Sequence, residues 1–239
     1  MAGNTGEAAS FQVGFPGLYV QGRNVIGDIW RFVAPFGSKV GLMTGTKSAE
    51  VINGIWKTMP ENFVIERRSV KGRCTRNTVK RLVDDWGSKA CDVLITVGGG
   101  TGIDIGKAAG RDLGIPIVTV PTLGSTDAAA TSLSVFYDED GAVESLEKLE
   151  THPAVVVVDT EIIAKSPPRF LAAGIGETIS TWIEARYCVE KAGVPVENVS
   201  DTALQCAKRS FELTVENGAQ AYEAVKRGKT SYAECFGIK

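Results

Sequence analysis

Short apolar runs alternate with segments of helical period in the first half of this 239-residue chain, and this alternation strongly restricts its fold. The expected strands are residues 38–45, 62–70, 91–100 and 115–122. The expected helices are 49–59 (Val51, Ile52, Ile55 and Trp56 on one face), a segment with Val79, Leu82, Val83 and Trp86, and 102–114, ending at Gly114. This order predicts an α/β fold, with a parallel sheet covered by helices on both faces.

The pattern changes after residue 122. Two strand-like runs within 133–146 flank an Asp-Gly pair at 140–141, which is a hairpin signal, and 154–163 has the pattern of a buried strand with an exit turn. After Pro167-Pro168 the period is helical, with apolar stripes at Ile175, Ile179, Trp182 and Ile183 and at Leu204, Ala207, Phe211 and Val215. We predict an α/β domain at 11–163 and a shortened all-helical domain at 164–239. Its stripes either pack on the α/β domain or need helices that this chain lacks.

Composition excludes several classes of protein. The net charge of −2 gives no basic surplus for nucleic acid, and no run of about 18 apolar residues could form a membrane span. The first ten residues lack the features of a signal peptide and are expected to be a disordered lead-in. The five cysteines are scattered, without a CxxC pair, as expected for buried, reduced thiols. We therefore expect a cytoplasmic protein.

The segment VGGGTGIDIG at 97–106 places three glycines, Gly98, Gly99 and Gly100, between an expected strand and an expected helix. Backbone N–H groups at such a turn can bind a phosphate, and the helix N-terminus adds positive potential. The segment is neither GxGxxG, because Ile103 occupies the last position, nor a P-loop. A phosphate site and a plain tight turn both remain open.

A polar run follows the next strand. It contains Thr122, Ser125, Thr126, Asp127 and Thr131. Because ligands of open parallel sheets bind beyond the carboxyl ends of the strands, the glycine turn and this polar run are expected to form one crevice. The alternative is a surface loop that caps its own backbone.

Three blocks resemble the glycerol dehydrogenases, which belong to the metal-dependent polyol and alcohol dehydrogenase family and share its fold with dehydroquinate synthase. They are VGGGTGIDIGKAAG at 97–110, VPTLGSTDAAATSLSVFYDEDG at 120–141, and AVVVVDTEIIAKSPPRFLAAGIGETISTWIEA at 154–185. FPGLYVQG at 15–22 resembles the family's opening strand, and the resemblance covers roughly residues 11–220. It implies an N-terminal nucleotide-binding domain and a C-terminal helical domain, with NAD and substrate between them.

The resemblance also implies roles for individual residues. Asp127 would lie near the substrate hydroxyls and is the candidate catalytic residue. Asp104 and Lys107 match a "D..K" pair of the family. The expected cofactor-binding residues are Thr46, Gly98, Gly99, Gly100, Thr101, Asp104, Thr122, Ser125, Thr131, Leu133 and Tyr137. Gly99 and Gly100 would lie against the pyrophosphate, and Thr131, Leu133 and Tyr137 would line the nicotinamide end.

The sequence departs from the family pattern at two places. The family binds a divalent metal, usually zinc, through an aspartate in a G-x-G-D turn and two later histidines. This chain has Glu177 in that turn and no histidine after His152, which we expect in a surface loop. We therefore expect an incomplete metal site with Glu177 as its one remaining ligand. Thr46 replaces an aspartate that binds the ribose of NAD, so NADP also becomes possible.

The expected function is oxidation of glycerol or a similar vicinal polyol to a hydroxyketone with NAD, without nucleic-acid or membrane partners and with a homo-oligomer possible. The alternatives are a catalytically silent nucleotide-binding or assembly protein, and a truncated product or natural fragment. Dehydroquinate synthase chemistry is disfavoured because STDAAATSLSV at 125–135 follows the dehydrogenase branch.

Overall fold

The computed structural model describes residues 13–52, 55, 58–87, 91–191 and 200–229. Its strands are β1 (Leu18–Gly22), β2 (Lys39–Gly45), β3 (Val64–Val70), β4 (Val93–Gly98), β5 (Ile117–Pro121), β6 (Leu133–Tyr137), β7 (Val143–Lys148) and β8 (Val155–Asp159). Its helices are α1 (Ile29–Val33), α2 (Ser48–Val51), α3 (Arg76–Gly87), α4 (Gly100–Leu113), α5 (Thr160–Lys165), α6 (Pro168–Glu190) and α7 (Asp201–Lys226), with short 3-10 turns at Val25–Asp28 and Ala34–Phe36.

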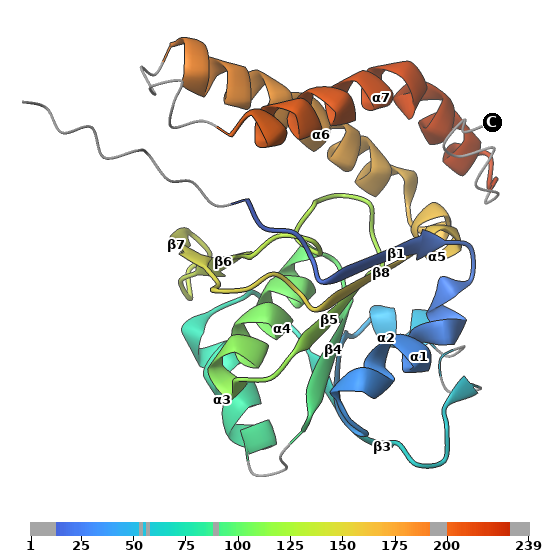
Figure 1. Cartoon of the computed structure of the whole chain (residues 1–239), viewed down its shortest axis with the longest axis vertical. Helices are drawn as coiled ribbons and strands as arrows, with labels where there is room; N and C mark the ends of the chain where they lie inside the picture. The colour runs from blue at the N-terminus through green and yellow to red at the C-terminus, as the bar shows by residue number, and fades with distance from the viewer. Residues whose placement is uncertain (1–12, 53–54, 56–57, 88–90, 192–199, 230–239) are drawn as a thin grey trace, which may run out of the picture.

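Six strands form one parallel sheet in the order β1-β8-β5-β4-β2-β3, which confirms the predicted α/β class (Figure 1). The central strand β4 explains why the sheet is covered on both faces. Its alternate residues Val93, Ile95 and Val97 pack in the cluster that includes α1, whereas Leu94 packs with α3 and α4. Successive side chains of a strand point to opposite faces, so a strand apolar at nearly every position needs a helical layer on each side.

Helix α4 lies unusually close to the sheet because its inner face carries glycines. A Cβ on Gly106 would overlap the side chain of Thr96 on β4, and one on Gly110 would overlap Ile117 on β5. The helix ends at Gly114, whose φ of 68° is the left-handed conformation that glycine adopts at least cost. The predicted end at Gly114 is confirmed. This close packing brings the side chains of α4 beneath the segment that follows β5.

The predicted hairpin forms as β6 and β7, an antiparallel pair separate from the main sheet. Charged contacts hold it against α3 and α4. Arg111 Nη1 lies 2.6 Å from Glu147 Oε2, and Arg76 also pairs with Glu147. Hydrogen bonds from these two guanidinium groups, that of Arg111 first, lower the pKa of Glu147. The Tyr137 N–H donates to the Cys74 carbonyl at 2.8 Å.

The expected helix at 49–59 is wrong in its length. Helix α2 covers only Ser48–Val51 and continues as 3-10 turns at the described positions beyond it. Ile52 and Ile55 are buried as expected, but Val51 is exposed, and Trp56 lies outside the described residues. The sequence at 53–54 is Asn-Gly, two weak helix formers, which favours a short helix here.

Helices α6 and α7 pack on each other and lie above the sheet in Figure 1, as predicted for a helical C-terminal part. The predicted stripes fail at Ile183 and Val215, which are 58% and 60% exposed. The buried residues of α7 are instead Gly218, Ala221 and Val225. Gly218 lies against α6, because a Cβ there would be in ordinary van der Waals contact, 3.4 Å from Ile175 Cδ1.

The predicted boundary between residues 163 and 164 falls inside α5, and the division into 11–163 and 164–239 remains a prediction. None of the described helices is both long and apolar enough to span a membrane.

The expectation that all cysteines are buried is wrong for Cys188 and Cys206, which are exposed, whereas Cys74 is buried; Cys235 lies outside the described residues. Burial raises the pKa of Cys74 to about 12. At pH 8 only about one Cys74 thiol in ten thousand is then the reactive thiolate.

We therefore expect a thiol reagent at pH 8 to label Cys188 and Cys206 rapidly and Cys74 only after unfolding in guanidinium. Peptide mapping of the labelled protein measures this directly. Labelling of native Cys74 as fast as Cys188 would contradict the burial described above.

A candidate dinucleotide cleft

The glycine turn and the polar run lie side by side, as the sequence predicts. Strands β4 and β5 are neighbours, with Gly98 paired to Pro121, and the Thr122 N–H donates to the Gly98 carbonyl at 2.9 Å. Because both strands are parallel, the segments that follow them leave the same edge of the sheet.

A cleft with a volume of about 630 Å³ opens at this edge. Ten of the predicted site residues line it: Gly99, Gly100, Thr101, Asp104, Ser125, Asp127, Thr131, Leu133, Tyr137 and Glu177. They come from α4, the segment after β5, strand β6 and helix α6. The fold therefore collects residues that are up to 78 positions apart in the chain, from Gly99 to Glu177.

The N-terminus of α4 forms one wall. Gly99 is its N-cap and provides no side-chain cap, so the N–H groups of the first turn remain available to an acceptor in the cleft. A Cβ on Gly100 would lie 2.8 Å from Thr126 Cγ2, and one on Gly99 would lie 2.8 Å from Leu123 Cδ1. A side chain at either glycine would therefore displace the side chain of Leu123 or Thr126 in the loop after β5. A Cβ on Gly102 would meet nothing within 4 Å, although Gly102 also lines the cleft.

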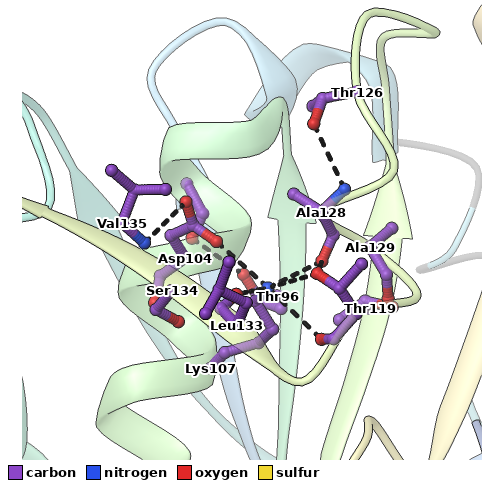
Figure 2. A network of polar contacts seen from close by, with 12 residues as sticks. Thr96, Asp104, Lys107, Thr119, Thr126, Ala128, Ala129, Leu133, Ser134 and Val135 are labelled. Atoms are coloured by element: carbon purple, nitrogen blue, oxygen red, sulfur yellow. Dashed lines mark hydrogen bonds and ion pairs between the residues drawn. The ribbon is translucent and has the colours of Figure 1, made fainter. Parts of the chain in front are cut away.

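Asp104 and Lys107, one turn apart on α4, form a buried ion pair with 3.0 Å between Oδ1 and Nζ. Burial raises the pKa of the Asp104 carboxyl and lowers that of the Lys107 ammonium, while their mutual attraction acts in the opposite direction. Asp104 Oδ2 also accepts from the Val135 N–H at 3.4 Å (Figure 2). The carboxylate that the sequence assigned to the cofactor is therefore already engaged in holding β6.

Asp127 is exposed and lies in the loop that follows β5. Helix α6 packs against this loop at Gly124. Glu177 on α6 lines the cleft beside Thr126 and Asp127 of this loop. Burial, and then the charge of Asp127, raise the pKa of Glu177. Gly174 makes this contact possible, because a Cβ there would overlap the Gly124 carbonyl oxygen.

These acids do not fit a tightly held metal ion. Zinc normally takes about three protein ligands. Asp104 is paired with Lys107, and Glu177 lies beside the loop that carries Thr126 and Asp127. Across the described ranges, no three His, Cys, Asp or Glu side chains come together in an arrangement that could hold a metal. His152 lies in a separate hollow with Gly14 and Lys148, which the Asp127 loop also lines.

Three predicted residues do not line the cleft. Gly98 ends β4, Thr122 is buried just beyond β5, and Thr46 is exposed just beyond β2. Sequence reasoning left six lining residues out of the predicted site: Gly102, Leu123, Thr126, Ala128, Val135 and Phe170. Thr126 belongs to the polar run, which signals it. Phe170 follows two prolines in another element, and no local pattern marks it as a site residue.

A second hollow of about 560 Å³ continues the cleft between the sheet edge and the helices. The two hollows share Leu123, Thr126, Asp127 and Glu177. Hydroxyl and amide side chains of the helices face this second hollow: Thr178, Thr181, Ser210, Thr214 and Asn217. Asp127 thus stands at the junction of a glycine-walled space and a space partly lined by hydroxyls.

The architecture is that of a polyol and alcohol dehydrogenase. The crystal structure of a probable glycerol dehydrogenase from Sinorhizobium meliloti 1021 superposes with a TM-score of 0.84 at 28% identity, covering 94% of this chain and 62% of that one. The profile of the family described as "Iron-containing alcohol dehydrogenase" matches residues 16–160.

The chain therefore belongs to the iron-containing alcohol dehydrogenase family. Glycerol dehydrogenases from Thermotoga maritima and Escherichia coli O6:H1 are 34% and 32% identical to it, each over 89% of this chain. The predicted resemblance is confirmed. The chain spans 59% of the length of these relatives.

Proposed function

We propose that this chain binds NAD in the cleft beyond β4 and β5 and takes part in the oxidation of glycerol or a similar vicinal polyol. The observation that carries the proposal is the meeting of an uncapped helix N-terminus, a hydroxyl-bearing loop and the exposed carboxylate of Asp127 at one cleft. The helix N-terminus can bind a pyrophosphate, and the Asp127 carboxylate can accept hydrogen bonds from substrate hydroxyls. The names of the related glycerol dehydrogenases support the substrate class.

In this proposal the carbinol carbon gives its hydride to the nicotinamide ring and its hydroxyl gives its proton to water. The products are a hydroxyketone and NADH. Asp127 would orient the polyol, and Leu133 and Tyr137, which also line the cleft, would hold the nicotinamide end of NAD. The family's metal would stabilise the alkoxide, and the acids described here do not fit one.

That misfit favours a second candidate function, a catalytically silent nucleotide-binding or assembly protein. Its cleft would bind the cofactor in the same way, and Glu177 would only support the Asp127 loop. The two candidates share cofactor binding and differ in turnover, so binding and turnover have to be measured separately.

Titration of NADH and NADPH fluorescence tests cofactor binding and the role of Thr46 together. Thr46 and Lys47 are exposed beyond β2, the neighbour of β4, and neither is an acid that would repel a 2′-phosphate. We expect both cofactors to bind. Thr46→Asp should shift preference toward NADH by about tenfold or more, since the acid binds the ribose hydroxyls and repels the phosphate.

Glu50→Gln, a change of charge on the exposed face of the nearby helix α2, is the control and should leave the ratio of the two affinities nearly unchanged. An unchanged ratio in Thr46→Asp would show that Thr46 lies away from the ribose. Failure of the unaltered chain to bind either nucleotide would refute the proposed function.

A further inference from the structure

The segment between β5 and β6 has no strand or helix from Ala128 to Ser132, yet its residues Ala128 and Thr131 line the cleft. Its carbonyl groups need donors, because a buried carbonyl without a hydrogen bond is costly. Thr119 on β5 donates to the Ala129 carbonyl at 2.7 Å. The Leu149 N–H donates to the Ser132 carbonyl at 2.7 Å, and the ammonium group of Lys107 is a further donor.

Lys107 is completely buried, which is rare for a lysine. Its Nζ donates to the Ala128 carbonyl at 2.7 Å and to the Leu133 carbonyl, and it lies 3.4 Å from both oxygens of Thr131. Ala128 begins the segment, Thr131 lies within it, and Leu133 directly follows it as the first residue of β6; Figure 2 labels Ala128 and Leu133 near Lys107. One ammonium group therefore ties the segment to α4 at three places.

Asp104 completes the arrangement. It balances the charge of Lys107, and its Oδ2 accepts from the Val135 N–H just beyond the same segment. Its backbone carbonyl accepts from the Ser134 hydroxyl at 3.2 Å. A buried ammonium is tolerated only when it is paired and hydrogen-bonded in this way. Because α4 also begins at the glycine turn, the helix is a rigid link between the two walls of the cleft.

We propose that Lys107 is a positioning residue that sets the nicotinamide end of the cleft, through Ala128, Thr131 and Leu133, relative to the glycine turn at the start of α4. The inference rests on the proposed function, since it concerns the same cleft. Lys107 itself does not line the cleft and has no exposed surface with which to touch a ligand. Its influence must pass through the segment that it holds.

Two ligands separate this role from a general structural one. ADP-ribose contains the pyrophosphate but no nicotinamide, whereas NADH contains both. In Lys107→Met we expect NADH affinity to fall about tenfold or more and ADP-ribose affinity to change by less than about threefold. Lys107→Gln keeps an amide donor without the charge. Its NADH affinity should lie between those of Lys107→Met and the unaltered chain. Lys80→Met, on the exposed face of α3, is the control and should match the unaltered chain.

Circular dichroism of each variant accompanies the binding assay. Equal losses for NADH and ADP-ribose, no loss for either, or unfolding of both Lys107 variants while Lys80→Met stays folded would each overturn the proposal. Unfolding of both Lys107 variants would mean that Lys107 stabilises the whole fold and does not specifically position this segment. If the unaltered chain binds neither ligand, the proposed function is wrong. The results with the Lys107 variants test the positioning role only when the unaltered chain binds NADH.

Discussion

Glycerol-dependent NADH formation by this 239-residue chain should be at least about a thousandfold slower than that of a metal-loaded glycerol dehydrogenase, even with added zinc. A polyol hydroxyl is a very weak acid, and hydride leaves an alkoxide far more readily than a neutral alcohol. The carboxylates at the cleft, Asp104, Asp127 and Glu177, do not form a three-ligand set. About 4 kcal/mol of transition-state stabilisation is then absent, which corresponds to the thousandfold.

The measurement is absorbance at the NADH band with glycerol, NAD and zinc, in the unaltered chain and in Glu177→Ala. Glu184→Ala, an exposed acid on the same helix that does not line the cleft, is the matched control. Fast zinc-dependent turnover that is lost in Glu177→Ala but kept in Glu184→Ala would contradict this prediction. It would show that Glu177 ligates the metal together with groups not described here.

The second large effect is expected at Gly102. A Cβ at this position meets no protein atom within 4 Å, but Gly102 lines the cleft at the first turn of α4, so an added side chain projects into open cleft space. Gly102→Val should therefore leave the fold intact and block the approach of a pyrophosphate to the backbone. We expect NADH affinity to fall about a hundredfold, or about 2.7 kcal/mol.

Gly176→Val is the matched control, because Gly176 is also helical, has no neighbour within 4 Å of an added Cβ and does not line the cleft. It should bind NADH like the unaltered chain. Gly100 is less suitable for this test, since a side chain there would first collide with Thr126. Unchanged NADH affinity in Gly102→Val would place the pyrophosphate elsewhere.

The fold was largely predictable because its signals are local. Buried strands such as β4 are continuous apolar runs, and Gly114 ends α4 where its left-handed backbone is needed. The Asp-Gly pair at 140–141 correctly predicted the β6–β7 hairpin. The expectations failed where packing between elements decides burial. Ile183 and Val215 have helical spacing but face solvent, because α7 buries the face with Gly218, Ala221 and Val225 instead.

The candidate site divides in the same way. Glycines and hydroxyls after two successive strands already indicated a crevice, since parallel strands end at one edge. The residues that line it from α6, Phe170 and Glu177, come from a distant part of the chain. The motif match suggested a metal ligand at Glu177, and the structure places this residue beside Thr126 and Asp127 of the loop after β5. The roles of the individual site residues in binding remain predictions.

By itself, the sequence determined the α/β class, the glycine turn, the polar run beside it and the membership of a dehydrogenase family, because strand periodicity and short motifs depend on neighbouring residues. Only the tertiary structure decided what Lys107 does. A lysine on an apolar helix face has no partner within its own sequence segment except Asp104, and the carbonyls that surround its ammonium group lie 21 to 26 residues away. They become its partners only because glycines at 106 and 110 allow α4 to lie close against the sheet beneath that loop.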